Sequence, residues 1–218
     1  MVSFGAVYFA ARAFCPNAAA EANLTTFDFT DVPTLDTERL RLRPISRADH
    51  DDWLAVWHSA GVLDYLIDFD GAPQDEVVRE IIDWAERITC EKSGIRWAIA
   101  LKPADRMIGS CGFHLYQRRH RRAEIGYELH SDYWRRGIMT EATQAVLQFC
   151  FDRLGVHRLE ADVVEGNAAS AALLRKVGFT LEGVWRERVF KRGAFQSLWQ
   201  FGLLAPEYRA RQKAADRA

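Results

Sequence analysis

The chain has 218 residues, of which 49% are hydrophobic and 27% are charged, and its formal net charge is −1. This balance predicts a folded globular protein with one substantial core and argues against a disordered chain. The small net charge gives no global field that would attract nucleic acid. No stretch approaches the roughly twenty apolar residues that a membrane-spanning helix requires, so we expect no membrane association.

Residues 1–34 begin with an apolar run that lacks the positively charged start of a secretory signal and is interrupted by Arg12. We interpret them as an extension that packs on the domain or on a partner. The cysteines show neither a CxxC pair nor the spacing of a metal site. They are Cys15, Cys90, Cys111 and Cys150. We therefore expect reduced thiols, a cytoplasmic location and no metal.

The first predicted elements lie between residues 37 and 106. The segment TERLRLRPIS alternates leucine with arginine and predicts a strand that Pro44 ends. Ser46, followed by acidic residues and a tryptophan-containing stripe, predicts a helix that ends near Gly61. A second helix is expected from about Pro73, and the segments IRWAIALK and MIGSCGFHLY predict two strands joined by a turn.

A run of basic residues, QRRHRR, follows these strands. A charge run at the tip of a hairpin is usually a solvated surface, which is the interpretation we favour. Contact with an acidic substrate or with ribosomal RNA is the alternative.

The most informative stretch is residues 123–142, AEIGYELHSDYWRRGIMTEA. Its first part alternates as a strand with two different faces, and its last part has the apolar spacing of a helix that ends near Leu154. Arg135, Arg136 and Gly137 lie between these parts. A helix N-terminus presents unpaired N–H groups and a partial positive charge, so this order predicts a strand, an anion-binding turn and a helix.

The C-terminal third predicts a second strand and helix and then a hairpin. The stretch HRLEADVVEGNAASAALLRKVGF has the pattern of a strand followed by a helix that Asn167 caps and Gly178 ends. The next segment predicts two strands joined through Arg192 and Gly193. The tail after Pro206 is rich in Ala, Arg and Lys, and we expect it to fray.

Two of these stretches carry a family resemblance. YWRRGIMTEA resembles the pyrophosphate loop of the GNAT N-acetyltransferases, and NAASAALLRKVGF resembles their Asn-x-x-Ser helix with its Gly-Phe signature. The Tyr-Trp pair before the loop and Thr-Glu-Ala after it are similar to the ribosomal-protein alanine acetyltransferases of the RimJ/RimL type. Three positions depart from the pattern: Trp134 stands for Gln or Arg, Met139 for Gly or Ala, and Ser197 for an Asp that relatives often carry.

The resemblance covers about residues 35–205. It implies a mixed α+β fold, the GNAT fold, in which a mostly antiparallel twisted sheet of about six or seven strands is flanked by about four helices. The chain is thereby divided into an N-terminal extension (1–34), an acetyltransferase domain (35–205) and a C-terminal tail (206–218). The link at residues 62–72 and the final hairpin are implied to border the acceptor cleft.

The resemblance also implies transfer of an acetyl group from acetyl-CoA to a primary amine, by direct attack within a ternary complex and without a metal. A backbone N–H near Leu129 would meet the oxyanion, and Asn167 would bind the pantetheine arm. The pyrophosphate would be held by backbone N–H groups and two arginine side chains of the turn. The residues of the turn are Arg135, Arg136, Gly137, Ile138, Met139 and Thr140.

Ser170 lies where the subgroup has a hydroxyl near the sulfur, so the resemblance makes it the proton donor for the thiolate. Hydrogen bonding to a helix carbonyl is its structural alternative. Three carboxylates could accept the amine proton: Glu124, Asp162 and Glu187, of which we favour Glu124 and Glu187. A surface ion pair is the alternative role of each.

The resemblance favours the α-amine of a protein or peptide N-terminus as the acceptor. Small amines, polyamines and antibiotics are the alternatives within the same activity. A non-catalytic CoA-binding regulatory module is a second class of function, which the departures at Trp134, Met139 and Ser197 motivate. Nucleic-acid binding is not expected, because it rests on RRHRR alone. Both a monomer and a homodimer are compatible with the sequence.

Overall fold

The computed structural model describes residues 27–67, 71 and 74–215, so residues 1–26 of the extension and the expected helix start at Pro73 lie outside the described residues. The strands are β1 (Leu35–Asp36), β2 (Leu40–Pro44), β3 (Ile95–Leu101), β4 (Met107–Gln117), β5 (Arg122–Leu129), β6 (Arg158–Val164), β7 (Thr180–Lys191) and β8 (Ala194–Leu204). The α-helices are α1 (His50–His58), α2 (Asp75–Cys90), α3 (Ile138–Gln148), α4 (Ala168–Val177) and α5 (Ala205–Ala215).

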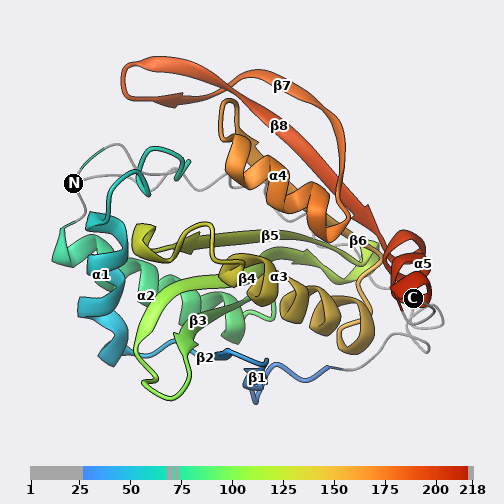
Figure 1. Ribbon diagram of the computed structural model, residues 1–218, viewed down its shortest axis with the longest axis horizontal. Coiled ribbons are helices and arrows are strands. Elements are labelled where there is room, and N and C mark those ends of the chain that lie inside the picture. The colour runs from blue at the N-terminus through green and yellow to red at the C-terminus, as the bar shows by residue number, and fades with distance from the viewer. Residues whose placement is uncertain (1–26, 68–70, 72–73, 216–218) are drawn as a thin grey trace.

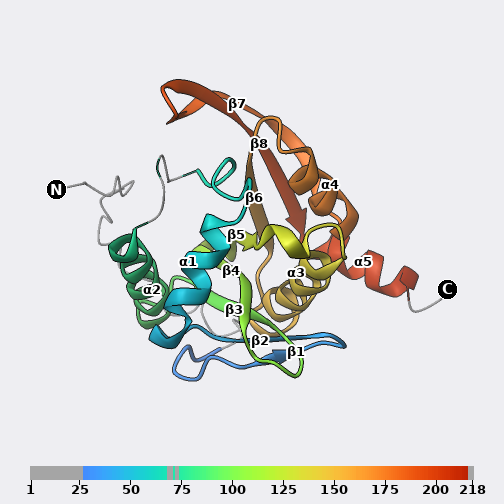
Figure 2. The same cartoon turned by 60° about the vertical axis from the view of Figure 1, so that its left-hand side comes forward.

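All the strands belong to one 8-stranded sheet with the order β1-β2-β3-β4-β5-β6-β8-β7 (Figure 1). The neighbours pair antiparallel except β5 and β6, which pair parallel. Helices α1 and α2 cover one face, and α3 and α4 cover the other (Figure 2). The mixed, mostly antiparallel fold is confirmed, with slightly more strands than the sequence predicts.

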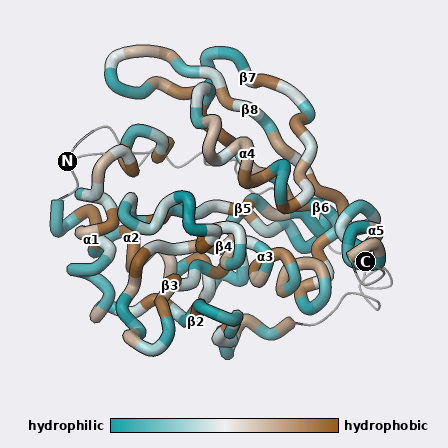
Figure 3. The backbone as a smooth tube through the Cα atoms, in the orientation of Figure 1, coloured by the Kyte–Doolittle hydropathy of each residue, from teal (hydrophilic) through white to brown (hydrophobic). Residues whose placement is uncertain are grey.

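Alternation along the strands explains why the two faces differ. Along β5, Ile125 and Leu129 are buried in the main core with α3, whereas Glu124 and Glu128 face the side of α1 and α2. Figure 3 shows the hydrophobic stretches along β3 and α3 that fill the interior. The α3 side therefore supplies the larger apolar core, and the α1 and α2 side combines a smaller apolar cluster with these charged groups.

Two helical segments extend the elements described above, one as the sequence predicted and one not. After α3 the helix continues as a π-helical turn, Phe149–Arg153, which reaches the predicted end near Leu154. The tail does not fray after Pro206, since it forms α5 and buries Tyr208. The Tyr208 ring stacks on Phe151 at 4.6 Å between centroids, a long-range contact that local composition cannot indicate. No helix among the described residues is long and apolar enough to cross a membrane.

A buried ion pair joins the sheet to α1. Glu128 of β5 accepts hydrogen bonds from Arg96 of β3, from Ser110 of β4 and from the Trp53 indole of α1, the last at 3.1 Å. The side chains of Arg96 and Glu128 are 9% and 6% exposed. Glu128 is therefore satisfied by structural partners, so its carboxylate is committed to the fold rather than to chemistry.

Replacing Arg96 by Met should lower the free energy of unfolding by about 3 kcal/mol, because the Glu128 charge would stay buried without its cation. Urea denaturation at pH 7 measures this loss. The matched control is Arg47→Met, since Arg47 pairs with Asp83 at the surface with 70% of its side chain exposed, and its loss should cost less than about 1 kcal/mol. Equal effects of the two substitutions would contradict the structural role of the buried pair.

Candidate active site

Strands β5 and β6 begin as a paired parallel ladder and then separate. The ladder comprises Arg122 with Arg158, Ala123 with Leu159 and Glu124 with Glu160. Beyond it β5 continues to residue 129 and β6 to residue 164 without pairing. The two strand edges that face each other past the ladder are called the β5–β6 split below. Their backbone groups need other hydrogen-bond partners, which a bound ligand can supply.

Leu129 directs its backbone toward this split. It lies opposite Gly109 of β4, and the next residue, His130, donates its N–H to the Ile108 carbonyl at 2.9 Å. In an antiparallel ladder this pattern turns the N–H and C=O of Leu129 away from β4. The C=O accepts from the Trp134 indole at 2.7 Å, whereas the N–H points into the split. Trp134 thus connects the following turn to the end of β5. This hydrogen bond gives a physical reason for a tryptophan where the family pattern has Gln or Arg.

The turn between β5 and α3 has the backbone of an anion site. Arg135 and Gly137 have positive φ angles of 58° and 75°, and no side chain caps the N-terminus of α3. The first N–H groups of α3 therefore lack intrahelical partners. Ile138 and Met139 are 4% and 8% exposed and pack in the core, so only their backbone can serve a ligand. Burial in the core also accounts for an apolar residue at position 139.

Arg39, which no motif in the sequence indicated, braces this turn. Its guanidinium donates to the Arg136 carbonyl at 3.0 Å and pairs with Glu141 of the first α3 turn at 2.7 Å. Glu141 also accepts from the Thr37 hydroxyl at 2.6 Å. An acid in the first turn would repel a phosphate, and the contacts with Arg39 offset that charge. The Arg136 guanidinium lies 5.6 Å from the centroid of the Tyr133 ring.

The start of α4 lies on the other side of the split. Asn167 caps α4 as predicted, since its side-chain oxygen accepts from the Ser170 N–H at 3.0 Å. The Ser170 hydroxyl lies 2.7 Å from the hydroxyl of Tyr127 on β5. Desolvation raises the pKa of Tyr127, so its phenol stays protonated at neutral pH. Sequence reasoning had placed Ser170 near the reacting sulfur but did not single out Tyr127.

The opposite face of the split carries a second group of polar side chains. Asp162 of β6 has its pKa raised to about 7, first by burial and then by the nearby carboxylates of Glu124 and Glu160. Arg188 and His114 oppose that rise. A carboxylate with this pKa exchanges its proton near neutral pH, which makes it suited to acid–base chemistry.

The neighbouring charges are paired to different extents. Glu160 is held by Arg122 and Arg158 at 2.9 and 2.7 Å. Glu124 lies 3.5 Å from His114, whose ring contacts the Trp84 indole of α2. Asp162 accepts from the Gln200 amide and forms no ion pair with the residues that the structure describes. Asp162 is therefore the carboxylate of this face with the least compensation for its charge.

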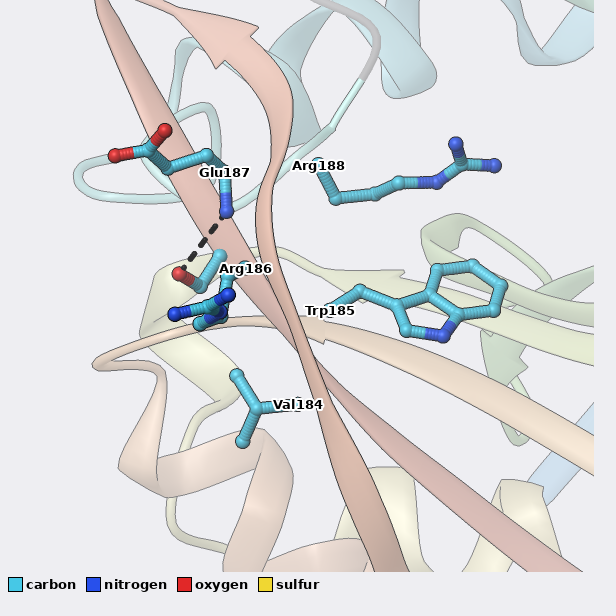
Figure 4. Close-up of a pocket in the computed structure, with 6 residues that line it drawn as sticks. Val184, Trp185, Arg186, Glu187 and Arg188 are labelled. Atoms are coloured by element: carbon cyan, nitrogen blue, oxygen red, sulfur yellow. Dashed lines mark hydrogen bonds between the residues drawn. The ribbon is translucent and has the colours of Figure 1, made fainter.

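Glu187, the third predicted acid, lies apart from this group. It occupies an irregular part of β7, where its φ is 52° and its N–H donates to the Ser197 hydroxyl at 3.3 Å. Figure 4 shows its side chain on the side of β7 opposite to Trp185 and Arg188, at the rim of an open pocket. The charges that chiefly shift the pKa of Asp162 come from other residues, with Glu124 first. The structure thus brings Glu124 together with Asp162 but not with Glu187.

The final hairpin reaches over to the link between α1 and α2, as the resemblance implied for a cleft wall. Lys191 donates to the Leu66 carbonyl, and Arg192 pairs with Asp64 at 2.8 Å. Arg188 lies over the Trp185 ring at 4.8 Å from its centroid. The charge of Arg188 in turn acts on Asp162, whose pKa it lowers.

Comparison with known proteins agrees with this geometry. The family described as an acetyltransferase (GNAT) domain matches residues 39–180. A relative from Bacillus subtilis (strain 168), the uncharacterized N-acetyltransferase YoaA, is 37% identical over 164 residues, which cover 74% of this chain and 90% of the relative. The chain belongs to the GNAT acetyltransferase family. It is an acetyl-CoA-dependent N-acetyltransferase. The alternative of a non-catalytic CoA-binding module, which the departures from the motif had motivated, is therefore not retained.

Solved structures show the same fold. Mycobacterium smegmatis RimJ in complex with CoA-disulfide has a TM-score of 0.70 at 23% identity, with 82% of this chain and 90% of that chain covered. Spermidine N-acetyltransferase from Vibrio cholerae, in complex with CoA and spermine, has a TM-score of 0.70 at 18% identity, with 79% and 99% covered. The second of these neighbours is named for spermidine, but a shared fold at this level of identity does not identify the acceptor of this chain.

Replacing both Arg135 and Arg136 by Ala should raise the dissociation constant for CoA about tenfold or more, because charge-assisted hydrogen bonds to the pyrophosphate would be lost. Isothermal titration calorimetry with CoA measures the change. Arg79→Ala, on the exposed side of α2, is the matched control and should bind CoA like the wild type. An unchanged dissociation constant in the double variant would show that the turn does not hold the pyrophosphate.

Proposed function

We propose that the enzyme acetylates the α-amine of a protein or peptide N-terminus, by direct attack of the amine on acetyl-CoA in a ternary complex. The observation that carries this proposal is Asp162, a carboxylate beside the split with a pKa of about 7. The α-amine of a peptide has a pKa of about 8, whereas that of a lysine side chain is about 10.4. A base that titrates near 7 is matched to the α-amine at neutral pH.

In this proposal the cofactor lies along the split with its thioester next to the end of β5. The first N–H groups of α3, together with Arg135 and Arg136, hold the pyrophosphate. The Asn167 amide nitrogen is available for the pantetheine arm, because the cap uses only the side-chain oxygen. The Leu129 N–H donates to the oxyanion of the tetrahedral intermediate.

The proton movements follow from the two faces of the split. On the side of α1 and α2, Asp162 accepts the proton that the amine loses as its nitrogen bonds to the carbonyl carbon. Glu124 acts on this step through its charge, since it raises the pKa of Asp162. On the side of α4, Ser170 donates a proton to the sulfur as the carbon–sulfur bond breaks. This assignment replaces Glu187 by Asp162, because Asp162 has the burial and the charge neighbours that a neutral-pH base requires.

A polyamine or another small amine is the second candidate acceptor. Glu124 and Asp162 together favour a cation on this face, and the spermidine N-acetyltransferase of known structure shares the fold. Release of CoA thiol from acetyl-CoA, followed with N-terminal peptides beginning with Ala or Ser and with spermidine, discriminates between the two. The proposal expects higher kcat/KM for the peptides, and a preference for spermidine would contradict it.

Asp162→Asn should lower kcat by about a hundredfold or more, because the base is lost. In the wild type, kcat at saturating substrates should fall as the pH drops below about 7, where Asp162 becomes protonated, and this acid limb should disappear in the variant. A pH series of initial rates measures both. Asp83→Asn, at the surface of α2, is the matched control and should retain the wild-type profile.

The same substitution should not destabilise the fold at high pH. The pKa of Asp162 is raised in the folded state, from 3.8 to about 7, so the unfolded chain loses this proton first and stability declines as the pH rises through that window. An asparagine at this position does not ionise, so the variant does not lose stability in this way as the pH rises. Asp162→Asn should therefore unfold at a temperature equal to or above that of the wild type at pH 8. A lower unfolding temperature would contradict the desolvation of Asp162.

Glu124→Gln tests the coupling of the two acids. Removing the Glu124 charge should lower the pKa of Asp162, because the like charge that disfavours ionisation is gone. The acid limb of kcat should then move to lower pH while activity at pH 8 is largely kept. Loss of activity at every pH together with loss of the limb would assign the base to Glu124 instead.

A further inference from the structure

The hydrogen bond between Tyr127 and Ser170 joins the two sides of the β5–β6 split. Tyr127 belongs to β5 and Ser170 to the first turn of α4, and their hydroxyl oxygens are 2.7 Å apart. Tyr127 shares a strand face with Ile125 and Leu129, which pack under α3. The two hydroxyl groups thus meet on the cofactor side of the sheet, close to where Leu129 directs its N–H into the split.

The direction of this hydrogen bond follows from the partners available. Among residues 27–67, 71 and 74–215, Ser170 is the one hydrogen-bond partner of the Tyr127 hydroxyl. If Ser170 donated, the desolvated phenol hydrogen would have no acceptor, which is unfavourable. If Tyr127 donates, the Ser170 hydrogen is free to point to another acceptor. The arrangement in which the tyrosine donates therefore satisfies more hydrogen-bonding groups.

The backbone around Ser170 is also held in place. The Asn167 cap fixes the Ser170 N–H at 3.0 Å, so the position of the residue in the first turn of α4 is set. The remaining freedom is rotation of the hydroxymethyl group, which in a helix often turns back to a carbonyl one turn earlier. A donor at 2.7 Å selects the rotamer that faces β5 instead.

We propose that Tyr127 is a positioning residue that holds the Ser170 oxygen and leaves its hydrogen directed at the sulfur of the thioester. This inference rests on the proposed function, because it requires a departing thiolate. When the carbon–sulfur bond breaks, its electron pair goes to sulfur, and the proton of the Ser170 hydroxyl moves to that sulfur. The Tyr127 O–H stabilises the charge on the serine oxygen, which regains a proton from water after the thiol has left.

Desolvation supports this role, since it raises the pKa of Tyr127 and keeps the phenol as a neutral donor over the working pH range. A buried tyrosine that only braced α4 against β5 would have a raised pKa as well, so the pKa agrees with both roles. The two roles differ in what they predict for the chemical step, so kinetics can separate them.

The experiment compares Tyr127→Phe, Ser170→Ala and the double variant. Tyr127→Phe should lower kcat about tenfold or more while KM for acetyl-CoA and the CoA dissociation constant change less than about threefold. The double variant should be no slower than Ser170→Ala alone, because both substitutions remove the same step. Tyr116→Phe is the matched control: it removes another partly buried phenol, on β4, and should leave kcat and KM unchanged.

Thermal unfolding of each variant separates folding from chemistry. A Tyr127→Phe variant that keeps the wild-type kcat but loses stability or CoA affinity would overturn the proposal and leave Tyr127 as a brace. Rate losses that multiply in the double variant would also overturn it, since the residues would then act independently. If the wild type released no thiol with any amine, the proposed function itself would fail, which is distinct from an active wild type with an unaffected Tyr127→Phe variant.

Discussion

The site depends on the early end of the parallel ladder between β5 and β6. Each strand in the middle of a sheet normally satisfies its backbone on both edges. Here the ladder stops at Glu124 and Glu160, so the facing edges of the two strands are left for other partners. One of the exposed groups, the Leu129 carbonyl, is taken by the Trp134 indole, and the adjacent N–H remains for a ligand.

The two faces differ in how their charges are compensated. On the side of α1 and α2, Glu128 is committed to Arg96, and Glu160 is shared by two arginines. These partners leave Asp162 as a desolvated carboxylate, with Glu124 beside it. Burial that would be a cost for a structural acid becomes useful for a base, because it moves the pKa toward neutral pH. The sheet therefore separates acids that are neutralised by arginines from the acid that we propose as the base, within a few residues of backbone.

The cofactor side combines backbone donors with a small set of braces. The open N-terminus of α3 and the cap of α4 both follow from local helix chemistry. Arg39, from the turn between β1 and β2, and Tyr127 of β5 connect these helix ends to the sheet. Such braces reduce the conformational freedom that this turn would lose on binding an anion.

What the sequence determined by itself was local. The strand, arginine turn and helix around Gly137, the Asn167 cap and the helix end at Gly178 depend on residues a few positions apart, so their spacing was sufficient to predict them. The order of these motifs also indicated the family and the mixed, mostly antiparallel sheet. Extension of the tail into α5 was missed, because it depends on packing against a distant helix.

The roles of individual side chains were decided by the tertiary structure. The contact between Tyr127 and Ser170 spans 43 positions, and that between Arg39 and Glu141 spans 102, so neither leaves a local pattern in the sequence. The pKa of Asp162 depends on burial and on charges from three other strands. The sequence alone favoured Glu124 and Glu187 over Asp162, because burial and distant charges leave no pattern along the chain. Spacing along the chain predicts which groups are available, whereas burial and distance determine which of them can react.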